Sequence, residues 1–225
     1  MALNKPIIWG TDVWDGFTNT DGTGFYHALI PKIFPSPDYS IEINYLPWKR
    51  SLLYLESGKV HMSGALPATN TFYLSEAPVL TETLFAVYVD KSEQECCDFT
   101  NKIGSYRNGY ENEIFNRAFP DNDNAVSVSS GSEGIKLLLR GKVDYFVDIG
   151  SVLERLILDF PADLKLQAVG SYPLYWAFNK TLHGQDLKRH FDKKIKELRQ
   201  SGQLEDLYLS YGLTPPKIDV LNYHK

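Results

Sequence analysis

Strand and helix patterns alternate along the first part of the chain, and this alternation restricts the possible folds more than any other feature. Residues 6–12 form a short apolar run typical of a buried strand, and residues 25–34 carry apolar side chains at helical spacing. Residues 39–46 alternate apolar and polar side chains as a strand does. A helix pattern follows over residues 48–58, and residues 60–65 are a short apolar strand. This order predicts βαβ units around a parallel sheet.

A second series of the same kind follows over residues 103–158. It includes helices predicted over residues 111–119 and 151–158 and a capping-box pattern at residues 129–133. Two long extended segments, residues 80–90 and 166–179, flank this series, and an amphipathic helix is predicted over residues 185–199. The pattern predicts two α/β lobes, each a mainly parallel sheet flanked by helices, joined by two crossover strands. We place lobe 1 at residues 1–86 plus 178–225 and lobe 2 at residues 87–177.

Composition narrows the classes of function. The 225 residues carry a formal charge of −5, which argues against the basic surface of a nucleic-acid-binding protein. No run of 18 apolar residues is present, so we expect no membrane insertion. Cys96 and Cys97 are adjacent, which disfavours a disulfide between them, and two cysteines alone do not make a zinc site. The histidines are scattered, and we expect neither a metal nor a cofactor.

A polar loop follows the strand predicted at residues 60–65. In parallel α/β sheets ligands bind at the carboxyl ends of strands, where such loops meet. Thr69 and Asn70 in this loop could therefore donate hydrogen bonds to a polar ligand, or could simply close a turn. The loop and the start of the helix at Trp48 are predicted to form one wall of a ligand cleft.

Four segments give the chain a family resemblance. They are WKRSLLYLESGKVH (residues 48–61), KIGSYRNGYENEIF (102–115), EGIKLLLRGKVDYFVD (133–148) and FDKKIKELRQSGQLEDLYLSYGL (191–213). Together they resemble, in order, motifs of the extracellular solute-binding proteins of family 3, which include the polar amino-acid-binding receptors of ABC transporters. The resemblance implies the type II periplasmic-binding fold, with two α/β lobes around a hinge.

The chain departs from this family at the loop that follows the first-lobe strand. Family members hold the ligand's α-carboxylate with the arginine of a Thr-x-Glu-Arg motif. Here the corresponding residues 67–79, PATNTFYLSEAPV, contain no arginine, which weakens the case for an ordinary α-amino-acid ligand. Arg50 and Arg107 become the candidates for a ligand carboxylate, because the planar guanidinium pairs well with that group.

The resemblance also assigns acidic positions. Asp12 matches an acid at the end of the first strand, and Asp148 matches the second-lobe acid that holds the ligand's ammonium group. A carboxylate beside a cation makes a strong charge-assisted bond. For Asp148 the alternative is a solvated strand end or a cap of the next helix.

Aromatic and backbone contacts complete the predicted site. Trp48 aligns with an aromatic residue that stacks on the ligand in the family, although an indole at a helix start can also be core. Trp14 is a candidate for the same role. Gly109 and Tyr110 would supply backbone amides and another ring.

The predicted function is a non-enzymatic binding protein that closes on a small polar ligand, an amino acid or a related amine or carboxylate. Its partner would be a membrane ABC permease, and we expect a monomer. We expect a periplasmic location with the signal peptide missing from this sequence, because residues 1–6 lack the apolar run of a secretory signal. Two alternatives stay open: a ligand-sensing domain of a membrane receptor, and a dehydratase acting on prephenate or arogenate.

Overall fold

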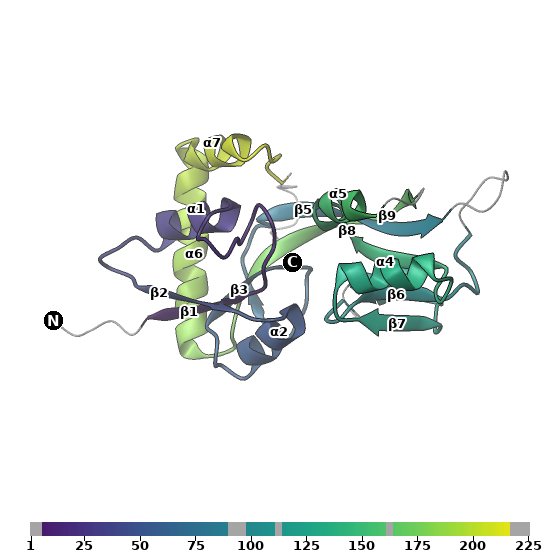
Figure 1. The fold of residues 1–225 in the computed structure, drawn as a ribbon. Coiled ribbons are helices and arrows are strands. Elements are labelled where there is room, and N and C mark those ends of the chain that lie inside the picture. The colour runs from purple at the N-terminus through teal and green to yellow at the C-terminus, as the bar shows by residue number, and fades with distance from the viewer. Residues whose placement is uncertain (1–5, 90–97, 111–113, 161–163, 217–225) are drawn as a thin grey trace. The chain divides into compact units, whose positions relative to one another are not determined.

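The computed structural model describes residues 6–89, 98–110, 114–160 and 164–216 (Figure 1). The chain divides into two compact units: unit 1 is Met1–Thr81 with Pro173–Lys225, and unit 2 is Glu82–Tyr172. Two long strands, β5 (Leu80–Val89) and β9 (Leu164–Phe178), run from one unit into the other. The lobe boundaries that the sequence predicts lie inside these two strands. Cys96 and Cys97 lie outside the described residues.

The sheet of unit 1 is mainly parallel. Its strands β1 (Ile7–Thr11), β2 (Ile41–Tyr45) and β3 (Met62–Leu66) have the order β2-β1-β3-β9, and β1 is parallel to both of its neighbours. β9 pairs antiparallel with β3 and with the short strand β4 (Tyr73–Leu74). The predicted order of strands and helices in this part of the chain is confirmed.

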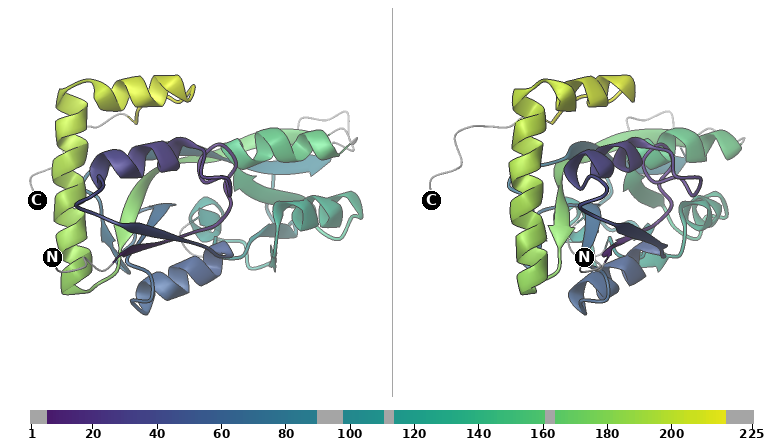
Figure 2. Two further views of the ribbon diagram at one scale, coloured as in Figure 1. Left: turned by 60° about the vertical axis from the view of Figure 1, so that its left-hand side comes forward. Right: turned by 90° about the vertical axis from the view of Figure 1, so that its left-hand side faces the viewer.

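Two helices connect the parallel strands of unit 1, α1 (Phe25–Ile33) and α2 (Trp48–Glu56). They lie on opposite faces of the β1–β2 sheet in both views of Figure 2. The chain returns to this unit as α6 (Leu182–Gln200) and α7 (Gln203–Ser210), and α1 packs against both. No helix in the described ranges is long and apolar enough to cross a membrane.

α6 confirms the amphipathic helix predicted over residues 185–199 and begins three residues earlier. The Thr181 hydroxyl caps it by accepting a hydrogen bond of 3.0 Å from the Gly184 amide. Its buried face includes Phe191, which stacks on Trp176 of β9 with ring centroids 5.8 Å apart. Trp176 also contacts the rings of Trp9 and Tyr26, so an aromatic core holds α1, β1, β9 and α6 together.

Unit 2 repeats the α/β plan. β6 (Gly104–Arg107) is parallel to β7 (Ala125–Val128) on one side and to β8 (Tyr145–Ile149) on the other, and β5 pairs antiparallel with β8. The helices are α3 (Asn116–Ala118), α4 (Gly131–Leu139) and α5 (Gly150–Leu156), followed by a 3₁₀ turn, Ile157–Asp159. The helix predicted over residues 111–119 falls partly outside the described residues, and its described part is a π-helical turn at residues 114–115 followed by α3.

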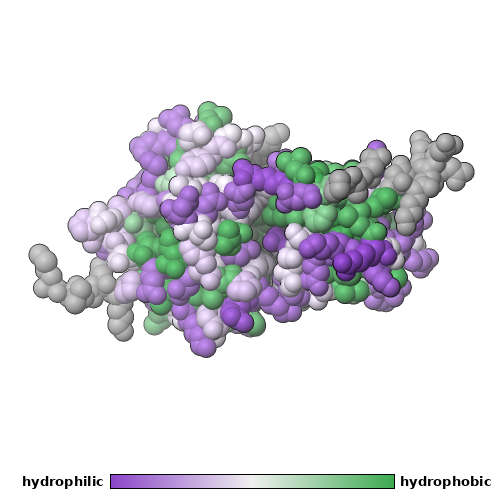
Figure 3. Space-filling view, viewed as in Figure 1, coloured by the Kyte–Doolittle hydropathy of each residue, from purple (hydrophilic) through white to green (hydrophobic). Residues whose placement is uncertain are grey.

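The capping box predicted at the start of α4 is confirmed. The Ser130 hydroxyl accepts a hydrogen bond of 3.2 Å from the Glu133 amide, and the Glu133 carboxylate accepts one of 2.7 Å from the Ser129 amide. The outward face of α4 is hydrophilic (Figure 3), with Lys136 and Arg140 exposed. Its inward face buries Ile135 and Leu138 in a core cluster with Phe146 of β8. α4 is therefore capped at its start by its own residues and packed against β8 through its apolar face.

Gly134 permits this close packing, because a Cβ atom there would overlap the Phe146 ring. We predict that Gly134→Ala lowers the free energy of unfolding by about 1–3 kcal/mol, because the added methyl group overpacks the core. This loss occurs although alanine has a higher helix propensity than glycine, by about 1 kcal/mol. Urea denaturation measures the change. Lys136→Ala, on the exposed face of the same helix, is the control and should change stability by less than about 0.5 kcal/mol. A neutral or stabilising Gly134→Ala would contradict the packing argument.

Candidate functional site

The carboxyl ends of β6, β7 and β8 lie side by side in unit 2, and we call the residues there (107–110, 129–131 and 148–149) the carboxyl edge of unit 2. Because β6 and β8 are parallel neighbours, Arg107 and Asp148 come together at this edge. Arg107 Nε lies 2.9 Å from Asp148 Oδ2. The Asp148 side chain is 0% exposed, and the Arg107 side chain is 19% exposed. Two predicted ligand-binding residues thus form an ion pair whose negative member is buried.

The Asp148 carboxylate has further compensation for its charge. Its Oδ1 accepts a hydrogen bond of 2.9 Å from the Ile149 amide. The first residue of α4, Gly131, approaches so closely that a Cβ atom there would lie 3.5 Å from Asp148 Oδ2. The start of a helix favours a nearby negative charge. Asp148 therefore joins β6 and β8 through one buried carboxylate, and the start of α4 lies beside that carboxylate.

Arg107 is held from a second side by Tyr110. The guanidinium Nη2 donates a hydrogen bond to the Tyr110 hydroxyl, and its carbon lies 4.6 Å from the centre of the Tyr110 ring. The ring is 4% exposed, so it supports the arginine from within unit 2. The turn between them places Gly109 at a φ of 97°, a conformation that favours glycine.

Glu82 is a buried carboxyl group that our sequence analysis missed. It is 7% exposed, and its Oε2 accepts a hydrogen bond of 3.4 Å from the amide of Ser151 in α5. Burial raises the pKa of Glu82, hydrogen bonds from Ser151 lower it, and the charges of Glu154 and Asp148 raise it again. The sequence does indicate that Glu82 is buried, because side chains alternate along a strand and Glu82 lies on the same buried face of β5 as Leu80 and Leu84.

In unit 1, the structure places Trp14 in the core. Its side chain is 9% exposed and stacks on Phe17, with ring centroids 4.1 Å apart and planes inclined by 24°. Asp12 follows β1 directly, and its carbonyl oxygen accepts a hydrogen bond of 2.8 Å from the Thr18 hydroxyl. This loop is therefore organised by its own contacts at the position where the sequence predicts ligand binding.

The other predicted residues of unit 1 lie around α2 and the loop after β3. Trp48 is half-buried and packs against a core cluster that includes Leu66, while Arg50 is exposed in the first turn of α2. The Thr69 hydroxyl accepts a hydrogen bond of 3.2 Å from the Thr71 amide, which closes a turn. The Asn70 carbonyl accepts one from the Lys180 ammonium group. The structure thus gives Thr69 the turn-closing contact that the sequence left as an alternative.

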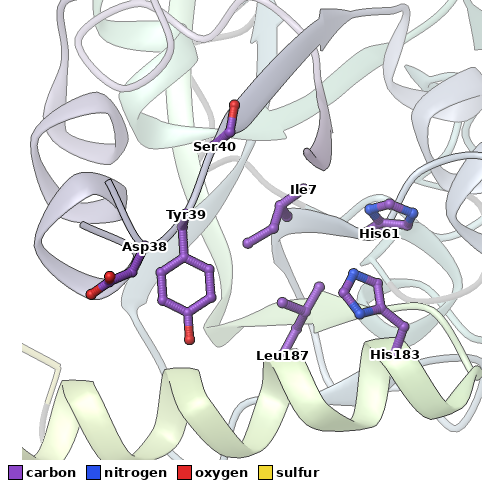
Figure 4. A pocket seen from close by; sticks show the side chains of 7 residues that line it. All are labelled: Ile7, Asp38, Tyr39, Ser40, His61, His183 and Leu187. Carbon is purple, nitrogen blue, oxygen red and sulfur yellow. The ribbon is translucent and has the colours of Figure 1, made fainter. Parts of the chain in front are cut away.

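Unit 1 also contains a pocket of about 420 Å³ at the amino ends of β1, β2 and β3 (Figure 4). Its lining residues are Ile7, Asp38, Tyr39, Ser40, His61, His183 and Leu187. The Nδ1 atom of His61 accepts a hydrogen bond of 3.0 Å from the Ile8 amide, which indicates a neutral ring with its proton on Nε2. The His183 ring meets the His61 ring edge-on, with centroids 4.8 Å apart. Burial lowers the pKa of His61, and His183 lowers it further.

The hydrogen bond from the Ile8 amide gives His61 a structural role, because it ties the residue before β3 to β1. The pocket lies at the edge of the unit 1 sheet opposite the carboxyl ends of β1 and β3. Within the described residues, no group of three or more His, Cys, Asp or Glu side chains is placed to hold a metal ion.

No protein-family model matches the sequence, and no curated protein matches it either. Solved structures do match the fold, and one is a histidine kinase sensor domain with similarity to periplasmic binding proteins. It is 16% identical, has a TM-score of 0.78, and the match covers 94% of this chain and 98% of that one. The chain has the periplasmic-binding-protein fold. This confirms the fold that the family resemblance implied.

Two further solved structures share this fold. The arginine-, lysine-, histidine-binding protein ArtJ from Geobacillus stearothermophilus is 20% identical, with a TM-score of 0.76 over 96% of this chain and 98% of its own. Another structure comes from a study of glutathione import in Gram-positive bacteria via GshT and the cystine ABC importer TcyBC of Streptococcus mutans. It is also 20% identical and has a TM-score of 0.75, and the match covers 95% of this chain and 98% of that one. In the periplasmic-binding-protein fold of this chain, Arg107, Tyr110 and Asp148 are the predicted residues that unit 2 brings together.

We predict that Glu82→Gln raises the melting temperature at pH 7. The pKa of Glu82 is raised in the folded state, so Glu82 stabilises the fold when it is protonated. This contribution is fully present below the ordinary pKa of a glutamate and is lost as the pH rises through the folded-state pKa. Glutamine cannot ionise and keeps an oxygen for the Ser151 amide. The advantage of the variant should shrink toward pH 4, and thermal unfolding between pH 4 and pH 8 measures it. Glu42→Gln, at an exposed position of β2, is the control; an equal gain there would contradict the explanation.

We predict that His61→Asn reduces the loss of stability on acidification. The folded-state pKa of His61 is lowered, so its contribution is present above the ordinary histidine pKa of about 6.5 and is lost as the pH falls. The asparagine oxygen can replace Nδ1 as the acceptor for Ile8. Melting temperatures between pH 7.5 and pH 5 should fall less for the variant than for the wild type. His183→Asn should also reduce this fall in melting temperature, but by less than His61→Asn does. If the melting temperature of His61→Asn falls with pH as steeply as that of the wild type, the prediction is contradicted.

Proposed function

We propose that the chain is a solute-binding protein that binds one small polar ligand, an amino acid or a related small amine or carboxylate, for uptake through a membrane ABC permease. The observation that carries this proposal is the Arg107–Asp148 pair at the carboxyl edge of unit 2. Ligands of α/β proteins bind at the carboxyl ends of strands, and this edge combines a partly exposed arginine side chain with the start of α4. The proposal includes a monomeric protein located in the periplasm.

The same proposal assigns roles to the predicted residues. In unit 2, Arg107 and the backbone amide of Gly109 contact the ligand, while Tyr110 and Asp148 support Arg107. In unit 1, ligand contacts by Asp12, Trp14, Trp48, Arg50, Thr69 and Asn70 remain predictions. A hinge motion would use β5 and β9, because these strands belong to both units.

A second candidate function is ligand sensing by a membrane receptor. The observation that favours it is the likeness to a histidine kinase sensor domain, which covers 94% of this chain. Both functions require ligand binding by the same fold, and they differ in the partner. A neighbouring permease and ATPase gene pair would support transport, and a histidine kinase region in the same gene would support sensing.

A thermal-shift screen over amino acids, opines, polyamines and small carboxylates tests the proposed function. A ligand present at about 100 times its dissociation constant adds about 2.7 kcal/mol to the stability of the folded state. For a chain of this length that gain corresponds to a rise of roughly 5–10 °C in melting temperature. Arg140→Gln, at the exposed arginine that directly follows α4, is the matched control and should show the same shift as the wild type. The absence of any shift at millimolar concentrations would contradict the proposal.

A further inference from the structure

We propose that unit 2 recognises an anionic group of the ligand through Arg107, and that Asp148 is a positioning residue for that arginine rather than a partner of a ligand ammonium group. This inference rests on the proposed function and names its ligand class: small carboxylates, with or without an amine. It reverses the charge that the family resemblance predicts for the ligand group bound at Asp148.

The burial of Asp148 is the first step. Its side chain is 0% exposed, one oxygen lies 2.9 Å from Arg107 Nε, and the other accepts the Ile149 amide. A ligand ammonium group could pair with this carboxylate only by displacing the guanidinium. Moving the guanidinium away from a carboxylate that is closed to solvent breaks a buried ion pair, which is strongly unfavourable. The carboxylate is therefore committed to the protein.

The orientation of Arg107 is the second step. Asp148 holds the Nε side of the planar guanidinium, and Tyr110 holds it through a hydroxyl acceptor and the face of its ring. The arginine side chain is 19% exposed, whereas both of its supports are buried. An arginine fixed in advance loses little conformational freedom when it binds a carboxylate. Its supports thus prepare it to bind an oxyanion.

The charge balance at the carboxyl edge is the third step. The pair is neutral as a whole, but its negative member is inside unit 2 and its positive member reaches the surface. The start of α4, next to Asp148, adds a partial positive charge. In unit 1, the loop at residues 67–79 contains neither arginine nor lysine. Among the residues of the carboxyl edge of unit 2, Arg107 is therefore the cation available to a ligand carboxylate.

Two panels of small molecules test the charge of the ligand. The anionic panel is succinate, glutarate, 2-oxoglutarate and L-glutamate, and the cationic panel is putrescine, cadaverine and agmatine. Glutarate and cadaverine are the matched pair, since both have charged groups at the two ends of a short methylene chain. Isothermal titration calorimetry on the full chain should detect binding of at least one anion and of no member of the cationic panel.

Substitutions at the pair separate its two members. Arg107→Gln alone would leave a buried charge and could unfold the protein, so the test uses R107Q/D148N, which removes both charges and keeps similar shapes. This double variant should retain the wild-type circular dichroism spectrum and lose at least about tenfold in anion affinity. R107K and D148N should each lose less anion affinity than the double variant does, because each keeps a cation at position 107. R140Q should bind as the wild type does.

The outcomes distinguish this inference from the function on which it rests. Anion binding that is lost in R107Q/D148N supports both. Cation binding that D148N abolishes, or anion binding that survives in R107Q/D148N, overturns the inference and leaves the solute-binding function standing. If no compound of either panel or of the wider thermal-shift screen binds, the proposed function and this inference both fall.

Discussion

The buried carboxylate of Asp148 is the constraint on which the described part of unit 2 depends most. A carboxylate removed from water must be compensated by a counter-charge and by hydrogen bonds. Arg107 supplies the counter-charge from β6, the Ile149 amide supplies a hydrogen bond from β8, and α4 brings its amino end close through Gly131. One side chain thus links the ends of β6 and β8, and the start of α4 lies beside it. The exposed part of Arg107 owes its position to this arrangement.

Much of the fold could be predicted because its signals are local. The alternation of strand and helix patterns, the capping box at Ser130 and the apolar stripe of α6 each depend on residues close together in the sequence. The boundaries were less accurate where propensity is weak. α5, for example, ends at Leu156 and passes into a 3₁₀ turn, whereas the sequence predicts one helix over residues 151–158.

The site was harder to predict, because its contacts join residues far apart in the sequence. Arg107 and Asp148 were both named, but nothing local shows that one neutralises the other. Trp14 is a candidate for stacking on the ligand, and in the structure its ring stacks on the ring of Phe17. Glu82 could have been found, since an acid in the inward phase of an apolar strand is unusual and calls for an explanation.

The most direct measurement of the central claim is the ¹⁵N-resolved NMR signal of the Arg107 Nε–H group during titration of the full chain. This N–H is buried against Asp148, so we predict a signal protected from rapid exchange with water before any ligand is added. Glutarate should shift the signal while leaving it protected, and cadaverine should leave it unchanged. A signal that cadaverine shifts or removes, and that glutarate does not affect, would contradict the account.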